Sequence, residues 1–158
     1  MSTQAAIALG SNLGDRRATL DQAVLMMDSH AEISVRTVSS FIETDPVGPE
    51  GQDAYLNGAV LVDTTLDPRD LLTVLNAIEA QLGRDRSTEQ RWGSRTCDLD
   101  ILLYGDRVVD DPELTIPHPR MREREFVLGP LAEIAPDAID PVSKKTVSEL
   151  LADLEKTL

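Results

Sequence analysis

Two aspartates separated by one residue are the feature of this sequence with the clearest chemistry. Asp98 and Asp100 lie in residues 96–104, an apolar segment that indicates a buried strand. Alternate side chains of a strand share a face, so both carboxylates point the same way, with Cβ atoms about 6–7 Å apart. Two ionised carboxylates beside a core strand are costly unless a cation lies between them. The pair therefore predicts a metal ion, and with it phosphate chemistry.

The expected metal is a hard cation. Oxygen ligands without a neighbouring histidine or cysteine ligand favour Mg²⁺ over zinc, and two carboxylates can hold one or two ions. Cys97 alternates to the opposite face of the strand, so we expect it in the core and not among the ligands. The alternative is that one aspartate pairs with an arginine and the other faces solvent at the end of the strand.

Arginines are concentrated around this strand although the chain is acidic overall. The net charge of −13 argues against duplex nucleic acid as the main ligand. Arginine suits bidentate contacts to phosphate, so this concentration favours a small polyanion near the aspartates. The alternative is that these are surface charges balancing neighbouring acids. Eight of the fifteen basic residues fall in this region: Arg84, Arg86, Arg91, Arg95, Arg107, Arg120, Arg122 and Arg124.

Several residues in the neighbouring loops suggest how a nucleotide would be held. Residues 84–95 form a polar loop that can close over a triphosphate and exclude water. Trp92 in this loop would stack on a base or, alternatively, anchor the loop in the core. His118, between two prolines, would donate to a phosphate or act as a base, or else be a surface histidine.

A second candidate binding region follows the long loop at residues 43–54. Tyr55 and Asn57 begin the strand after this loop, which is a suitable place for a planar ligand that forms hydrogen bonds. The alternative is that Tyr55 is a strand-end aromatic residue covering the core.

The composition predicts one domain over residues 1–158. Hydrophobic residues make up 41% and charged residues 27%, as in ordinary water-soluble proteins, and no apolar run approaches the roughly 20 residues of a membrane span. The N-terminus lacks a secretory pattern, and a single cysteine allows no internal disulfide. We therefore expect a cytoplasmic protein without a membrane or nucleic-acid partner. We also expect a monomer, although no feature of the sequence decides the oligomeric state.

Hydrophobic periodicity predicts an α+β fold. We expect strands at 4–9, 33–41, 55–64 and 96–104, a short return strand at 107–109, and a tight turn at 10–14. We expect helices capped by Asp15 and Asp67, the second ending at Gly83, then a short helix near 128–133 and a final helix at 147–158. Prolines should keep residues 112–119 irregular. This order is typical of a ferredoxin-like α/β sandwich, an antiparallel sheet with helices packed on it.

Several separated motifs, in order, give the sequence a specific resemblance. They lie at residues 7–14, 41–49, 55–57, 91–102 and 116–119. Together the chain resembles the 6-hydroxymethyl-7,8-dihydropterin pyrophosphokinase family of folate biosynthesis, from residue 7 to about residue 136. The resemblance implies a ferredoxin-like fold and transfer of pyrophosphate from ATP to the pterin hydroxymethyl group, with release of AMP. It also implies two Mg²⁺ ions held by Asp98 and Asp100.

The resemblance also assigns residues to the two substrates. Arg84 and Arg95 join the aspartate pair as catalytic residues, and Glu79 matches a helix carboxylate near the site. The ATP side comprises Arg84, Arg86, Trp92, Arg95, Ile101, Thr115, His118 and Arg124, and the pterin side comprises Thr44, Val47, Tyr55, Asn57 and Phe126. The chain departs from the family pattern at Asp45, Glu113 and Pro119, which bears on ATP affinity and loop closure.

Two other classes of function use the same features. Another Mg²⁺-dependent nucleotidyl or phosphoryl transferase, or a nuclease, would use the aspartate pair, and a nuclease predicts further acidic or histidine ligands converging on the metal. A non-catalytic ferredoxin-like module that binds RNA predicts exposed sheet aromatics and a basic face. Few aromatic residues and strong acidity disfavour the RNA module.

Overall fold

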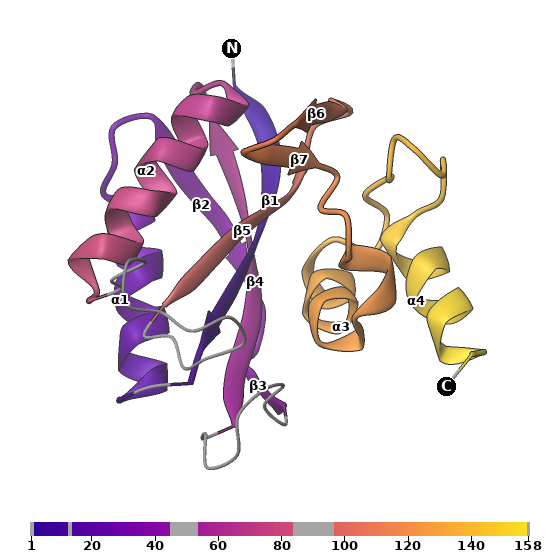
Figure 1. Cartoon of the computed structure of the whole chain (residues 1–158), viewed down its shortest axis with the longest axis horizontal. Coiled ribbons are helices and arrows are strands. Elements are labelled where there is room, and N and C mark those ends of the chain that lie inside the picture. The colour runs from indigo at the N-terminus through magenta and orange to yellow at the C-terminus, as the bar shows by residue number, and fades with distance from the viewer. Residues whose placement is uncertain (1, 13, 45–53, 84–96, 158) are drawn as a thin grey trace.

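A five-stranded antiparallel sheet forms the centre of the molecule (Figure 1). The computed structural model describes residues 2–12, 14–44, 54–83 and 97–157. The strand order is β2-β4-β1-β5, and β3 also pairs with β4. This order and the antiparallel pairing confirm the predicted ferredoxin-like sheet. The strands are β1 (Thr3–Ser11), β2 (Ile33–Val38), β3 (Ile42–Thr44), β4 (Tyr55–Thr64) and β5 (Asp98–Tyr104).

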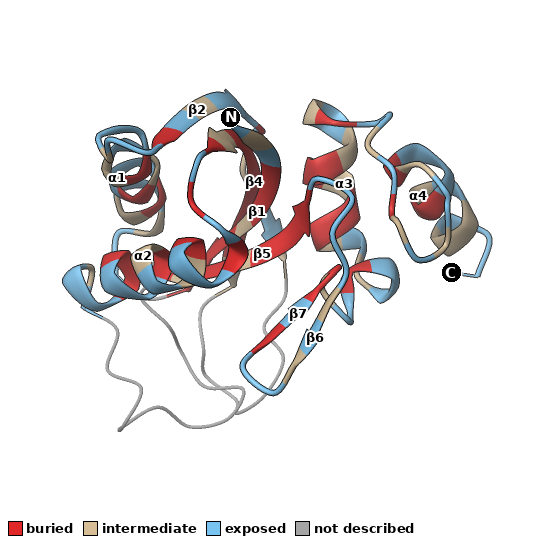
Figure 2. Cartoon of the chain, turned by 90° about the horizontal axis from the view of Figure 1, so that it is seen from above, coloured by how far each residue is buried: buried red, intermediate tan, exposed pale blue. Residues whose placement is uncertain are grey.

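Helices cover both faces of this sheet. Helices α1 (Arg16–Asp28) and α2 (Pro68–Gln81) lie on one face, and α3 (Glu125–Ile134) lies on the other (Figure 2). Helix α4 (Val147–Glu155) packs outside α3 (Figure 1). Within the described residues, no helix combines the length and apolar character needed to cross a membrane.

The predicted helix caps are present. The Asp15 carboxylate accepts a hydrogen bond from Ala18 N at 3.1 Å, and the Asp67 carboxylate accepts one from Asp70 N at 2.8 Å. Each side chain satisfies a backbone donor that the first helical turn leaves unpaired. Gly83 follows α2 with a φ of 97°, a conformation that glycine adopts at low cost.

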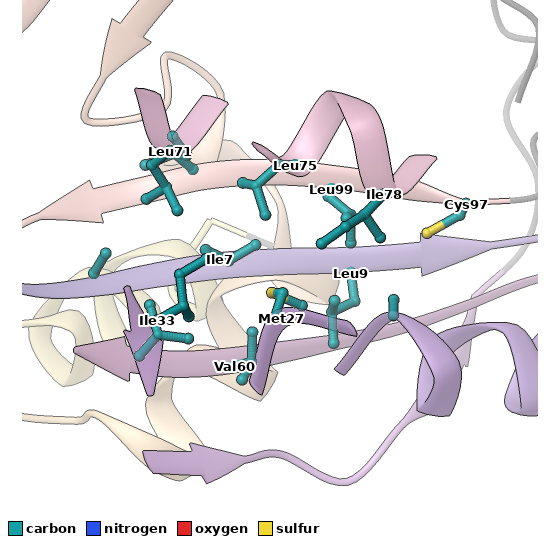
Figure 3. Close-up of a cluster of buried hydrophobic side chains, with 14 of the residues drawn as sticks. Ile7, Leu9, Met27, Ile33, Val60, Leu71, Leu75, Ile78, Cys97 and Leu99 are labelled. Carbon is teal, nitrogen blue, oxygen red and sulfur yellow. The ribbon is translucent and has the colours of Figure 1, made fainter. Parts of the chain in front are cut away.

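The two sheet faces carry two separate apolar cores. Figure 3 shows the core under α1 and α2, which contains Ile7 and Leu9 of β1 together with Leu71 and Leu75 of α2. The core under α3 contains Ala6, Ala59, Leu61, Leu103, Val127, Leu128 and Leu131. Because side chains alternate along a strand, β1 directs Ala5, Ile7 and Leu9 to the first core and Ala6 and Ala8 to the second.

Two predicted strand boundaries are wrong for local reasons. The predicted strand 33–41 ends early, at Val38 of β2, because the Ser39 hydroxyl, at 2.8 Å, takes the hydrogen bond that Ala59 N donates, and β3 begins only at Ile42, beyond the predicted end. A side chain thereby replaces the backbone acceptor that a continuous strand would supply. Strand β1 continues through Ser11, beyond the predicted end and into the predicted turn, because Gly10 still pairs with Asn57.

The predicted return strand at 107–109 is also wrong. Strand β6 (Val109–Asp111) pairs instead with β7 (Leu114–Ile116), within the stretch predicted to be irregular. Leu114 and Ile116 are buried while Thr115 is exposed, so β7 has the alternation of a half-buried strand. Two helices differ in length: α3 begins before the predicted residue 128, and α4 ends at Glu155. A 3₁₀ turn, η1 (Met121–Glu123), precedes α3.

Candidate active site

The aspartate pair lies on the sheet face that α3 covers. Cys97, Leu99 and Ile101 are buried in the core under α1 and α2, as Figure 3 shows for Cys97 and Leu99. Asp98 and Asp100 alternate with them and are half-buried. The prediction that both carboxylates share one face, with Cys97 and Leu99 turned away, is therefore confirmed.

Three strands bring the predicted pterin side next to this pair. Gly10 of β1 pairs with Asn57 of β4 on one side and with Asp98 of β5 on the other. A Cβ atom built on Gly10 would lie 3.1 Å from Asn57 Oδ1, 3.7 Å from Tyr55 Cδ1 and 4.0 Å from Asp98 Cβ. These three side chains therefore surround one glycine, so the amide, the phenol ring and the carboxylate share one surface.

The Asn57 side chain is oriented by β3. Its Nδ2 donates a hydrogen bond of 2.7 Å to Thr44 Oγ1, and Thr44 pairs with Tyr55 in the strand ladder. Asn57 is almost completely buried, at 8% exposed. Since Nδ2 donates to Thr44, the amide oxygen is the atom directed towards Gly10.

His118 lies beside the aspartate strand. Its backbone N–H donates to Leu102 O of β5 at 3.0 Å. Burial and the positive charges of Arg124 and Arg120 lower the pKa of His118, while the negative charge of Asp98 opposes them. His118 Nδ1 also accepts from Arg120 N at 3.2 Å, so the neutral imidazole carries its proton on Nε2. The Nε2–H of His118 is thus a hydrogen-bond donor on a side chain whose pKa the charge of Asp98 affects.

Arg124 and Phe126 come together at the start of α3. The Arg124 guanidinium carbon lies 5.6 Å from the centre of the Phe126 ring, within the range of a cation–π contact. The positive charge of Arg124 also lowers the pKa of His118, so the Arg124 and His118 side chains interact electrostatically. Phe126 is half-buried beside the core under α3. A residue predicted for ATP and one predicted for the pterin therefore meet here.

The Glu79 side chain of α2 binds the backbone of β5 between the two aspartates. It is buried at 1% exposed in α2, and its Oε2 accepts a hydrogen bond of 2.8 Å from Leu99 N. Leu99 lies between the two aspartates, and β5 is an edge strand of the sheet in the part of the chain that the structure describes. The carboxylate therefore satisfies a backbone donor of an edge strand at the residue that separates Asp98 from Asp100.

The other predicted residues are not among the side chains around Gly10, or they lie outside the described residues. The Ile101 side chain is in the core under α1 and α2, so a nucleotide would meet only its backbone. Thr115 is exposed on β7. Glu113, one of the family departures, forms an ion pair of 3.1 Å with Arg69. Outside the described residues lie Asp45, Val47, Arg84, Arg86, Trp92 and Arg95.

Sequence reasoning missed the importance of Gly10. We assigned it to a structural turn, whereas it occupies the centre of the surface shared by Tyr55, Asn57 and Asp98. The available signal is the run of small residues at Ala6, Ala8 and Gly10 on one face of β1. The importance of these small residues becomes evident only when the register of β1, β4 and β5 is known.

The described residues contain no cluster of three or more histidine, cysteine, aspartate or glutamate side chains suited to a metal ion. The converging ligands that a nuclease predicts are thus not found in this part of the chain. Two carboxylates on one face suit a hard cation that completes its coordination with water and phosphate oxygens.

Comparison with known proteins identifies a family and close relatives. The model of the 7,8-dihydro-6-hydroxymethylpterin-pyrophosphokinase family matches residues 6–136. A Bacillus subtilis protein is 54% identical over 134 residues, which cover 85% of this chain and 79% of that protein. A Methylorubrum extorquens protein is 47% identical over 153 residues, covering 97% and 94%. Both are named 2-amino-4-hydroxy-6-hydroxymethyldihydropteridine pyrophosphokinase.

Solved structures share the fold. A crystal structure titled HPPK-DHPS in complex with substrates matches 99% of this chain with a TM-score of 0.75 at 12% identity. The Plasmodium falciparum HPPK-DHPS A437G structure with STZ-DHP matches 97% with a TM-score of 0.74 at 14% identity. This chain spans 44% and 45% of the lengths of those chains.

Proposed function

The chain belongs to the 7,8-dihydro-6-hydroxymethylpterin-pyrophosphokinase family, and we infer that it transfers pyrophosphate from ATP to 6-hydroxymethyl-7,8-dihydropterin in folate biosynthesis. The acceptor is the pterin hydroxymethyl group, and AMP is released. One observation carries the assignment of the site. Gly10 brings Asn57 of the predicted pterin side and Asp98 of the predicted metal side onto one surface.

The pterin side is formed by β3, β4 and the start of α3. A pterin is planar and has hydrogen-bonding groups along one edge, so it suits an oriented amide with aromatic rings nearby. Asn57, held by Thr44, supplies the amide, and Tyr55 and Phe126 supply the rings. Val47 belongs to this side by the family resemblance.

The metal side is formed by Asp98 and Asp100. Their shared face, partial burial and oxygen chemistry fit Mg²⁺, and we propose that they hold two ions. When bound, the ions supply positive charge that neutralises the triphosphate oxygens. The negative charge of Asp98 and Asp100 otherwise repels ATP, since like charges in a partly buried site interact strongly.

The ATP side includes His118 and Arg124. The Nε2–H of His118 can donate to a phosphate oxygen, and the Arg124 guanidinium supplies charge-assisted donors. By the resemblance, Arg84, Arg86, Trp92, Arg95, Ile101 and Thr115 also belong to this side, Ile101 through its backbone. The structure supports this assignment through His118, which is within electrostatic range of both Asp98 and Arg124.

The reaction exchanges one bond to phosphorus for another. The pterin hydroxyl oxygen forms a bond to the β-phosphorus, the bond from that phosphorus to the AMP oxygen breaks, and the hydroxyl proton is released. Such a transfer is accelerated mainly by positioning the reactants and by stabilising charge. We propose that the shared surface of Asn57, Gly10 and Asp98 serves the positioning, because a pterin bound at Asn57 would lie beside the phosphates bound at Asp98.

The RNA-binding alternative is disfavoured by the arrangement of the helices. Such modules use an open sheet face with exposed aromatic rings. Here α1 and α2 cover one face of the sheet and α3 covers part of the other (Figure 2). We further propose that residues 1–158 act as one cytoplasmic monomeric domain with two small-molecule substrates.

Product analysis tests this function. Purified protein is incubated with ATP, Mg²⁺ and 6-hydroxymethyl-7,8-dihydropterin, and we expect AMP and the pterin diphosphate in equal amounts. The matched control replaces the acceptor with 6-methyl-7,8-dihydropterin, which lacks the attacking hydroxyl, and should give no AMP. Formation of ADP, or ATP consumption that is independent of the pterin, would contradict the proposal.

A further inference from the structure

Arg16, the first residue of α1, contacts β3 and the residue that precedes β4, and these two strands carry pterin-side residues. Its Nη1 donates a hydrogen bond of 2.6 Å to Ala54 O, and its Nη2 pairs with the Glu43 carboxylate. The Arg16 side chain is half-buried, at 26% exposed. One guanidinium thus holds residues that are 27 and 38 positions away in the sequence.

These two contacts are adjacent to pterin-side residues. Glu43 precedes Thr44, Ala54 precedes Tyr55, and Thr44 and Tyr55 are partners in the β3–β4 ladder. Thr44 in turn accepts the hydrogen bond that orients Asn57. Strand β3 has only three residues and pairs only with β4 in the described topology, so its own ladder gives it little support. The Arg16 contacts therefore reinforce the pairing that sets the position of Thr44.

The placement of Arg16 is locally unfavourable for the helix. A cation at a helix N-terminus meets the positive end of the helix dipole, and the acid at this terminus is the Asp15 cap, since the first turn of α1 itself contains none. Departures from local helix preferences are expected where a residue has another role. The long-range contacts of Arg16 provide such a role.

Arg17 makes a second contact from the same helical turn. Its guanidinium carbon lies 5.2 Å from the centre of the Phe41 ring. That ring occupies the space above Gly58, where an added Cβ would lie 2.5 Å from Phe41 Cδ1. The first turn of α1 therefore contacts the residue that precedes β3 as well as β3 itself.

We propose that Arg16 is a positioning residue for the pterin site. By joining the Glu43 carboxylate to the Ala54 carbonyl, it keeps Thr44 opposite Tyr55 and so keeps the Asn57 amide in its recognition orientation. Arg16 acts through these residues and not on the reacting atoms. The inference rests on the proposed function, because it assigns to Arg16 an effect on one of the two substrates.

Steady-state kinetics of Arg16→Met test this role. Methionine keeps an apolar chain but removes the charge and every donor. We expect the KM for the pterin to rise by about threefold to a hundredfold, while kcat and the KM for ATP stay within about twofold. The matched control is Arg36→Met, which removes another arginine–carboxylate pair, that with Asp63 on β4, and should leave all three constants unchanged.

Two further variants separate positioning from general stability. Arg16→Lys keeps a charge but offers a point donor that cannot hold both acceptors, so the pterin KM should be intermediate. Glu43→Gln keeps an acceptor without the charge and should raise the pterin KM by a smaller factor. If Arg16→Met does not fold, Glu43→Gln decides: a raised pterin KM supports the proposal, and an unchanged one overturns it.

The outcomes distinguish this inference from the proposed function. If the wild-type protein forms no AMP from ATP and the pterin, the proposed function fails first. If the wild type is active and folded Arg16→Met has an unchanged pterin KM, only the role of Arg16 is overturned. Equal increases in the KM for the pterin and the KM for ATP, in proportion to a lowered Tm, would also overturn it, because they indicate a purely structural residue.

Discussion

Gly10 and Asn57 are partners on adjacent strands, and a Cβ atom at Gly10 would lie 3.1 Å from Asn57 Oδ1. At that distance the amide has to move by a few tenths of an ångström, and its bond to Thr44 limits the movement. We expect Gly10→Ala to raise the pterin KM several-fold, and Gly10→Val to raise it more. Steady-state kinetics with the pterin as the varied substrate measure this effect.

A matched glycine substitution controls for stability. A Cβ atom at Gly129 in α3 meets nothing within 4 Å, so Gly129→Ala should stabilise the protein by about 0.5–1 kcal/mol. Gly10→Ala should give no such gain in thermal unfolding. An unchanged pterin KM in Gly10→Val would contradict the assignment of this surface to the pterin.

The buried carboxylate of Glu79 predicts a coupled loss of stability and activity. Glu79→Leu leaves Leu99 N without its acceptor and should reduce the free energy of unfolding by about 1–3 kcal/mol. Because Leu99 separates Asp98 from Asp100, kcat should fall as well. Glu79→Gln is the control, since its carbonyl can still accept the bond and should retain more of both properties. Chemical denaturation and AMP release are the measurements, and equal effects of the two substitutions would contradict this role.

Asp140 predicts a loss of stability in acid. Burial opposes its ionisation, but hydrogen bonds from Val142 N, the Ser143 hydroxyl and Arg122 outweigh burial and lower the pKa of Asp140 below its ordinary 3.8. The lowered value means that the stabilisation is present above pH 3.8 and disappears as pH falls through the folded-state pKa.

The comparison of Asp140→Asn with the wild type measures this contribution. At neutral pH the substitution should lower the free energy of unfolding by about 1–3 kcal/mol, and the difference should shrink as pH falls below 3.8. Asp137→Asn changes an exposed aspartate in the same region and is the control. A difference from the wild type that does not change with pH would show that the Asp140 charge is not the stabilising feature.

His118 predicts a titration below its ordinary value of 6.5. Burial lowers the pKa of His118, with Arg124 and Arg120 acting in the same direction. The folded protein therefore binds this proton less well than the unfolded chain, so the stabilisation is present above pH 6.5 and is lost as pH falls through the folded-state pKa. NMR titration measures the value, and His118→Gln assigns the signal. Titration at or above 6.5 would contradict the charge environment described here.

The aspartate strand illustrates what an amino-acid pattern can establish. Alternation alone placed Cys97 and Leu99 in the core and the two aspartates on the other face, because strand geometry leaves few alternatives. The bounds of β4 were likewise predicted at 55–64. Buried apolar runs with clear caps and turns are local signals that the tertiary structure rarely overrides.

The features that sequence reasoning missed depend on contacts between distant residues. The position of Gly10 at the centre of the site requires the register of three strands. Arg16 looks like an ordinary surface arginine until β3 and β4 are placed beside α1. The β6–β7 hairpin was obscured by Pro112 in its turn and Pro117 directly after β7, because prolines end strands as well as break them.

The central claim, that Asp98 and Asp100 hold the cations of pyrophosphoryl transfer, is tested most directly by AMP release from Asp100→Asn over a range of Mg²⁺ concentrations. The substitution keeps the size of the side chain but removes its charge. The exposed Asp110→Asn on β6 is the matched control. We predict that turnover falls by at least about a hundredfold in Asp100→Asn and stays within about twofold in the control. Turnover within about tenfold of the wild type, a barrier change of only about 1.4 kcal/mol, would contradict the claim.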